Sequence, residues 1–139
     1  MNNILIFKTA SDVVLKKLFI ELKNKEAKKY CLIQSSLINN FQKEYKDVEF
    51  IDIQQEGFYN ISDNVLEVIQ NILFTEIYIP TTGPRAMNFG NILEIVCSLN
   101  YKKIIFYNCN GERNIIKKKS QLEEKLIRLY INLINLIYR

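Results

Sequence analysis

The stretch that decides the fold is "NILIFKTASDVVLKKLFIEL", residues 3–22. Its first five residues form an apolar run rich in β-formers, which is typical of a buried strand over 3–7. A polar loop follows, and apolar residues then recur at helical spacing within 11–27. Ser11 suits the N-cap of that helix, and Asp12 suits its first turn. This strand–loop–helix unit is the repeating unit of an α/β protein.

The unit recurs along the rest of the chain. Similar patterns predict strands at 30–34, 48–53, 76–80 and 103–108, and helices at 36–45, 62–73, 87–100 and 120–137. Strict alternation of strand and helix predicts a parallel sheet with helices on both faces. We therefore expect one three-layer Rossmann-like α/β domain over 1–139, with a five-stranded parallel sheet in the order 3-2-1-4-5 and a long C-terminal helix.

Two features near the C-terminus concern partners. The basic segment "RNIIKKKS", 113–120, is expected to be a solvated connector, with an anionic partner or a membrane surface as the alternative. The helix at 120–137 carries leucines near heptad spacing and isoleucines on a second face. Two apolar faces predict either burial on both sides or a partner, which would be a second copy, a second Rossmann-like subunit or a bilayer surface.

The composition narrows the possible chemistry. The chain has 139 residues, a net charge of +4 and no histidine, so the commonest general base and metal ligand is missing. Its three cysteines form no CxxC pair, and no metal site is expected. An odd number of cysteines without a signal peptide indicates the cytoplasm. No apolar run reaches the ~18 residues that a transmembrane segment needs.

Topology selects the place for a ligand. In an open parallel sheet, ligands bind beyond the carboxyl ends of the strands, where the strand order reverses. With the order 3-2-1-4-5, that point lies between the strands at 3–7 and 76–80. The loops that follow them are "KTASD", 8–12, and "TTGPRAMN", 81–88. We expect ligand-binding roles for Lys8, Thr9, Ser11, Thr81, Thr82, Gly83, Arg85 and Asn88.

The loop at 81–88 has the composition of an anion cradle. Gly83 permits a close backbone approach, and Arg85 offers a guanidinium fork suited to phosphate or carboxylate. The helix that follows presents free amides and the positive end of its dipole to the same spot. The loop matches neither a P-loop nor GxGxxG, so no nucleotide cofactor is indicated. The alternative is an ordinary strand-to-helix turn with a surface arginine.

The loop at 8–12 is open to two interpretations. Asp12 is the candidate catalytic residue, as a carboxylate base in the cleft. The alternative is that Asp12 only caps the helix and that the Lys8 side chain extends along the surface to reach water.

The residues of both loops resemble those of heptosyltransferase-type glycosyltransferases. The strand, loop, aspartate and apolar helix at 3–25 look like the opening of such enzymes, and "FTEIYIPTTGPRAMNFGNILEIVCSLNYKKIIFYNCNGE", 74–112, resembles the later part of their acceptor-side domain. The resemblance implies that Asp12 takes the position of the catalytic base. Enzymes of this GT-B type combine two Rossmann-like domains, so the chain would be one half that binds a sugar or a phosphate-bearing ligand with a partner chain.

A second resemblance is to CRISPR-associated Rossmann-fold sensor domains. "TTGPRAM", 81–87, is similar to their T-G-G-T-K-x-M loop in Thr82, Gly83, the basic Arg85 and Met87. The resemblance implies a homodimer that binds cyclic oligoadenylate as a regulatory module, with Thr9 also lining the pocket. A third hypothesis is an interaction domain without any ligand.

Overall fold

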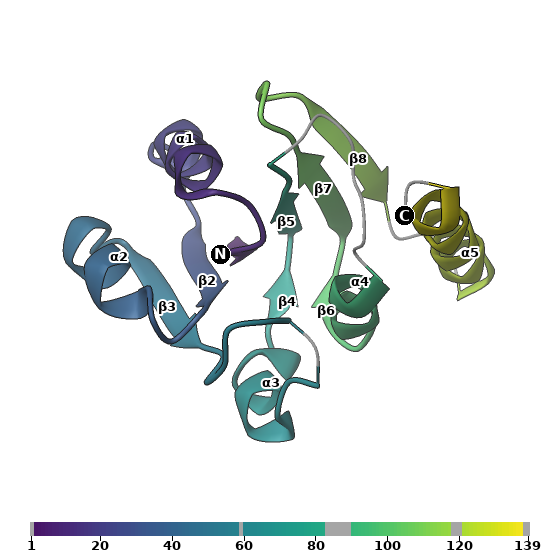
Figure 1. Cartoon of the computed structure of the whole chain (residues 1–139), viewed down its shortest axis with the longest axis horizontal. Coiled ribbons are helices and arrows are strands. Elements are labelled where there is room, and N and C mark those ends of the chain that lie inside the picture. The colour runs from purple at the N-terminus through teal and green to yellow at the C-terminus, as the bar shows by residue number, and fades with distance from the viewer. Residues whose placement is uncertain (1, 59, 83–89, 118–120, 138–139) are drawn as a thin grey trace.

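The computed structural model describes residues 2–58, 60–82, 90–117 and 121–137. Five helices and eight strands lie within these ranges (Figure 1). In chain order they are β1 (Asn3–Phe7), α1 (Asp12–Leu22), β2 (Lys28–Ile33), α2 (Ile38–Glu44), β3 (Val48–Asp52), α3 (Asp63–Gln70), β4 (Leu73–Phe74), β5 (Glu76–Pro80), α4 (Gly90–Cys97), β6 (Asn100–Tyr101), β7 (Lys103–Tyr107), β8 (Arg113–Lys117) and α5 (Gln121–Ile137).

The main sheet has the order β3-β2-β1-β5-β7-β8. Its first five members are parallel, and they are the five predicted strands in the predicted order. The order reverses at β1, which pairs with β2 on one side and with β5 on the other. The predicted α/β fold and its long C-terminal helix are therefore confirmed, and the switch point lies between β1 and β5. The sheet differs from the predicted five-stranded parallel one in having a sixth, antiparallel strand, β8.

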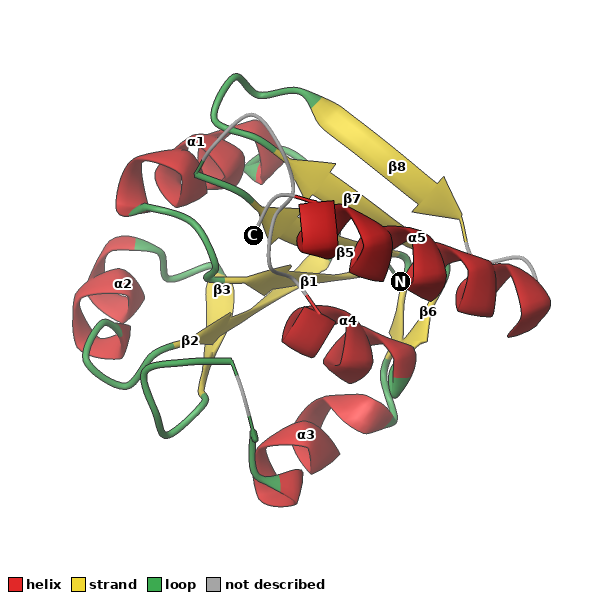
Figure 2. Ribbon diagram, turned by 45° about the vertical axis from the view of Figure 1, so that its right-hand side comes forward, coloured by secondary structure: helices red, strands yellow, loops and turns green. Residues whose placement is uncertain are grey.

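The sheet lies between two layers of helices, as Figure 2 shows. Alternate residues of β1 serve the two faces, with Ile4 and Ile6 in the core beneath α1 and α2. Leu5 and Phe7 belong to the core beneath α3 and α4. All four side chains are fully buried, and burial of each contributes about 1.5–3 kcal/mol. α5 packs beside α4, and its Ile131 joins the same core.

The expectation for the segment 113–120 is corrected by β8. Residues 113–117 form a sixth strand that pairs with β7 antiparallel, with Ile105 opposite Ile115. Only two of its residues are apolar, and Ile115 is exposed at the sheet edge. A polar, lysine-bearing sequence is typical of edge strands, which must not pair with other chains. That polarity made the segment look like a connector.

A second, two-stranded parallel ladder lies at the amino ends of β5 and β7. β4 pairs with β6 through Leu73 opposite Asn100 and Phe74 opposite Tyr101. The first residue of each strand, Leu73 or Asn100, was predicted to end a helix, but α3 ends at Gln70 and α4 at Cys97, three residues before the predicted ends. The ladder joins the segments that lead into β5 and β7, so the amino ends of these strands are fixed together.

Candidate functional site

The loops that follow β1 and β5 are joined directly at the switch point. The Thr9 hydroxyl donates a hydrogen bond of 2.6 Å to the Pro80 carbonyl. The Ser11 backbone N–H donates one of 2.9 Å to the Thr82 hydroxyl. Thr81 extends the pairing of β5 with β7, because its N–H donates to the Tyr107 carbonyl at 2.7 Å. The sequence prediction that these two loops share one edge of the sheet is confirmed for their described residues.

Lys8 is the buried charge of this carboxyl edge. Its side chain is only 8% exposed, and its ammonium lies 3.1 Å from the Asp12 carboxylate, which is 54% exposed. The same ammonium donates a hydrogen bond to the Ala10 carbonyl. A buried lysine needs such partners, since an unpaired buried charge is costly. Lys8 is therefore not a surface lysine that extends to water, and Asp12 is one member of an ion pair.

Ser11 is the N-cap residue of α1, as predicted, but its hydroxyl forms no capping hydrogen bond. Its backbone N–H donates instead to the Thr82 hydroxyl, in the loop that follows β5. Of the remaining predicted ligand-binding residues, Gly83, Arg85 and Asn88 lie outside the described residues.

Gln34 adds an unsatisfied acceptor to the same edge. It follows β2, and its Nε2 donates a hydrogen bond of 3.0 Å to the Lys8 carbonyl. Its Oε1 is buried and has no hydrogen-bond partner among the described residues. A buried amide oxygen without a donor costs free energy, so a hydroxyl or amide of a ligand that reached it would be stabilised there.

The other polar loops at this edge are engaged in local structure. The Ser35 hydroxyl donates to the Asp52 carboxylate. In the turn after β7, the Asn108 side-chain oxygen accepts from the backbone N–H groups of Asn110 at 3.0 Å and Glu112 at 2.9 Å. An asparagine that bonds to the backbone two residues later is typical of a turn. These residues shape the edge of the sheet.

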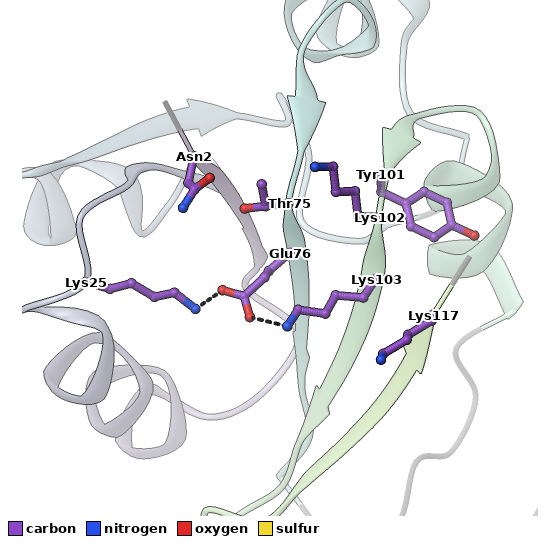
Figure 3. A pocket seen from close by; sticks show the side chains of 8 residues that line it. All are labelled: Asn2, Lys25, Thr75, Glu76, Tyr101, Lys102, Lys103 and Lys117. Carbon is purple, nitrogen blue, oxygen red and sulfur yellow. Dashed lines mark hydrogen bonds and ion pairs between the residues drawn. The ribbon is translucent and has the colours of Figure 1, made fainter. Parts of the chain in front are cut away.

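A cavity of about 640 Å³ lies at the opposite, amino edge of the sheet (Figure 3). It is lined by Asn2, Lys25, Thr75, Glu76, Tyr101, Lys102, Lys103 and Lys117. None of these residues was a candidate site residue, although Lys117 lies in the segment 113–120, for which an anionic partner was the alternative interpretation. The signal was present in the starts of the strands, where "EIYIP" and "KKIIF" each open an apolar run with a charge. Single charges at strand starts are common on surfaces, and sequence patterns do not show that these come together.

Glu76 is the buried carboxylate that lines this cavity. Its side chain is 5% exposed, and it pairs with Lys25, which is 39% exposed. Lys103, 35% exposed, lies 3.4 Å from the other carboxylate oxygen. Burial by itself raises the pKa of Glu76, but the hydrogen bonds and charges of Lys25, and then of Lys103, lower it below the usual value. The carboxylate therefore stays ionised at neutral pH.

Tyr78 connects this carboxylate to β8. Its fully buried hydroxyl donates to Glu76 at 3.4 Å and accepts from Arg113 at 3.3 Å. Arg113 also pairs with Glu21 of α1 at 3.2 Å. Burial, and after it the charge of Glu76, raises the pKa of Tyr78 to about 12. The hydroxyl thus remains a neutral donor that ties α1, β5 and β8 together.

Comparisons with protein-family models, with curated proteins and with solved structures found no match to this chain. Among the described residues, no three or more cysteines and carboxylates are grouped so that they could hold a metal ion. In the same ranges, every helix is too short or too polar to cross a bilayer.

Proposed function

We propose that this chain binds a phosphate-bearing small molecule at the carboxyl edge between β1 and β5. The observation that carries the proposal is the direct joining of the two loops, through Thr9 to Pro80 and Ser11 to Thr82. It gathers a buried ammonium, hydroxyls and a helix start at the switch point, which is where sheets of this kind hold ligands. The unsatisfied oxygen of Gln34 supplies a further polar group at that edge.

The ligand class divides the proposal in two. In a glycosyltransferase-like half-domain, Asp12 would act as a base on a sugar hydroxyl, with the second half supplied by a partner chain. In a nucleotide-sensing module that binds cyclic oligoadenylate, no base is needed. The Lys8–Asp12 ion pair favours the second, because the Asp12 carboxylate is already engaged with the Lys8 ammonium at 3.1 Å. Anionic phosphate would also compete with Asp12 for the Lys8 ammonium.

The partner surface is proposed to be the outer face of α5. Ile131 is buried against the core, whereas five large apolar residues of the same helix are exposed, namely Leu129, Tyr130, Leu133, Leu136 and Ile137. Exposed apolar side chains that gather on one helix mark an interaction site. The occupant would be a second copy of the chain or a second Rossmann-like subunit. All three cysteines are free, which fits the cytoplasmic location that the sequence predicts.

Ligand binding is tested by thermal shift and titration calorimetry of the purified chain. The panel holds nucleotide-sugars, mononucleotides, sugar phosphates and cyclic oligoadenylates. A ligand at 100 times its Kd adds ~2.7 kcal/mol, which raises the Tm by about 5–15 °C in a domain of this size. Arg85→Ala should weaken a phosphate ligand by ~1.5–3 kcal/mol. Lys46→Ala, which removes one exposed positive charge elsewhere, is the matched control and should change little.

The result of the ligand panel distinguishes the three functional hypotheses. A cyclic oligoadenylate that binds and is lost in Arg85→Ala supports the sensor, and a nucleotide-sugar with the same behaviour supports the transferase half. A panel without any shift would leave the third hypothesis, an interaction domain.

Light scattering after size exclusion tests the partner separately. Leu129→Glu with Leu133→Glu should convert a dimer to a monomer, whereas Val13→Glu with Ile20→Glu, at exposed sites of α1, should not. A wild-type chain that is monomeric at micromolar concentration would rule out the second copy and leave the second subunit.

A further inference from the structure

The amino edge of the sheet carries a cavity whose lining is dominated by positive charge (Figure 3). We propose that this cavity is a second ligand site, for a small polyanion such as inorganic triphosphate or a nucleoside triphosphate. It lies at the opposite ends of the strands from the loops at 8–12 and 81–88, so it is distinct from the site proposed above and does not depend on it.

The charges of the lining favour an anion. Four lysines and one glutamate line the cavity, so its formal net charge is 4 − 1 = +3. Glu76 is engaged with Lys25 and Lys103. The ammonium groups of Lys102 and Lys117 have no ion-pair partner within the described ranges. A ligand with a single charge would leave this excess uncompensated, whereas a triphosphate would match it.

The positions of the lysines are set by rigid elements. β4 and β6 pair immediately before Thr75 and Lys102, and the Lys102 backbone N–H donates to the Phe74 carbonyl at 3.0 Å. Ile77 pairs with Ile104, so the preceding residues, Glu76 and Lys103, are neighbours across β5 and β7. Sites built on strands hold their groups more precisely than sites on loops.

Glu76 organises the cavity from within. Figure 3 shows Lys25 and Lys103 reaching its carboxylate from opposite sides, so both ammonium groups are held within the cavity. Ordinary surface lysines extend their ammonium groups into water one by one. They do not converge on a buried carboxylate. Burying this carboxylate costs free energy, but it holds two ammonium groups in fixed positions. Cations that are already positioned bind an anionic ligand with a smaller loss of conformational entropy.

The size of the cavity fits the ligand class. Small-molecule sites measure roughly 300–1,000 Å³, and this cavity measures about 640 Å³. Inorganic phosphate would fill only a small part of it. A triphosphate reaches several lysines at once, and a nucleoside attached to it would occupy the remaining volume.

Calorimetric titration of the full chain with inorganic triphosphate, and separately with ATP, tests the proposal. The variant Lys102→Ala with Lys117→Ala removes two ammonium groups that do not pair with Glu76, so the fold should be retained. It should raise the Kd at least ~10-fold, since each removed contact is charge-assisted. Lys43→Ala with Lys46→Ala makes the same change of net charge at exposed positions elsewhere and should change the Kd less than about 2-fold.

Backbone amide NMR locates the bound triphosphate independently of the variants. Shifts at Thr75, Glu76, Lys102 and Lys103 support the amino-edge site. Shifts at Thr9, Ser11 and Thr82 instead would mean that triphosphate uses only the carboxyl edge, and would overturn it. Equal weakening in both double variants, no measurable binding, or preferential binding of a short single-stranded RNA would also overturn it. Arg85→Ala should leave the amino-edge shifts unchanged, so failure of one site is distinguishable from failure of the other.

Discussion

Lys8 and Glu76 are buried charges of opposite sign that lie at opposite edges of the sheet. At the carboxyl edge, the buried member of the ion pair is the Lys8 ammonium, and its partner Asp12 is exposed. At the amino edge, the buried member is the Glu76 carboxylate, and two partly exposed lysines reach it. Within the part of the chain that the structure describes, Lys8 thus has one charged partner, whereas Glu76 has two. Because an uncompensated buried charge is costly, the number of partners decides how much the loss of one of them matters.

The largest effect is expected when Glu76 loses both charged partners. Lys25→Met and Lys103→Met each keep an apolar stem over the carboxylate but remove its cation. Either single change leaves one lysine and should cost less than about 1 kcal/mol of unfolding free energy. The double change leaves a buried carboxylate uncompensated and should cost about 2–4 kcal/mol, more than the sum of the singles. Urea unfolding of the four proteins measures this cycle.

Adding Glu76→Gln to the double variant is the control for that cycle. It removes the uncompensated charge and should restore part of the lost stability. Additive single effects would show that Glu76 does not depend on these lysines, and the contrast between the two edges would fail.

A smaller effect is expected at the carboxyl edge. Asp12→Ala removes the one charged partner that Lys8 has among the described residues but leaves the hydrogen bond to Ala10. Because Asp12 is half exposed and water can partly replace it, the cost should be about 1–2 kcal/mol in urea unfolding.

Asp63→Ala is the matched control, since Asp63 is an exposed acid in the first turn of α3 and forms no ion pair among the described residues. The Asp63→Ala variant loses only the interaction of this carboxylate with the helix dipole, which contributes about 0.3–1 kcal/mol to the free energy of unfolding. Equal losses in the two variants would mean that Asp12 acts as a first-turn acid and that its pairing with Lys8 contributes nothing.

The two edges also differ in how far the sequence predicted them. The carboxyl edge was predictable, because strand order and loop composition depend on local patterns, and the contact of Thr9 with Pro80 confirms that its loops meet. The amino edge was not, because it depends on which isolated charges the sheet brings together. β8 shows the same limit: its pairing comes from β7 and from the link of Arg113 to Tyr78, which no local pattern of 113–117 reveals.

The smallest effect is the pH dependence of the Tm, which tests how Glu76 and the neighbouring Tyr78 are held. The pKa of Glu76 lies below its ordinary value of 4.5 in the folded state, so its contribution is present above pH 4.5 and is lost as the pH falls through the lowered pKa. Tyr78 has the opposite sign: its folded pKa is about 12 against an ordinary 10.0. Its contribution is complete below pH 10.0 and is lost as the pH rises toward 12.

Glu76→Gln should therefore flatten the Tm profile only below pH 4.5, and Tyr78→Phe only above pH 10.0. The acid effect is modest, because Lys25 and Lys103 are both more than a third exposed and water screens their charges. If Glu76→Gln leaves the fall of the Tm at acid pH unchanged, other carboxylates govern acid unfolding. The buried Glu76 carboxylate would then not be held as the structure indicates.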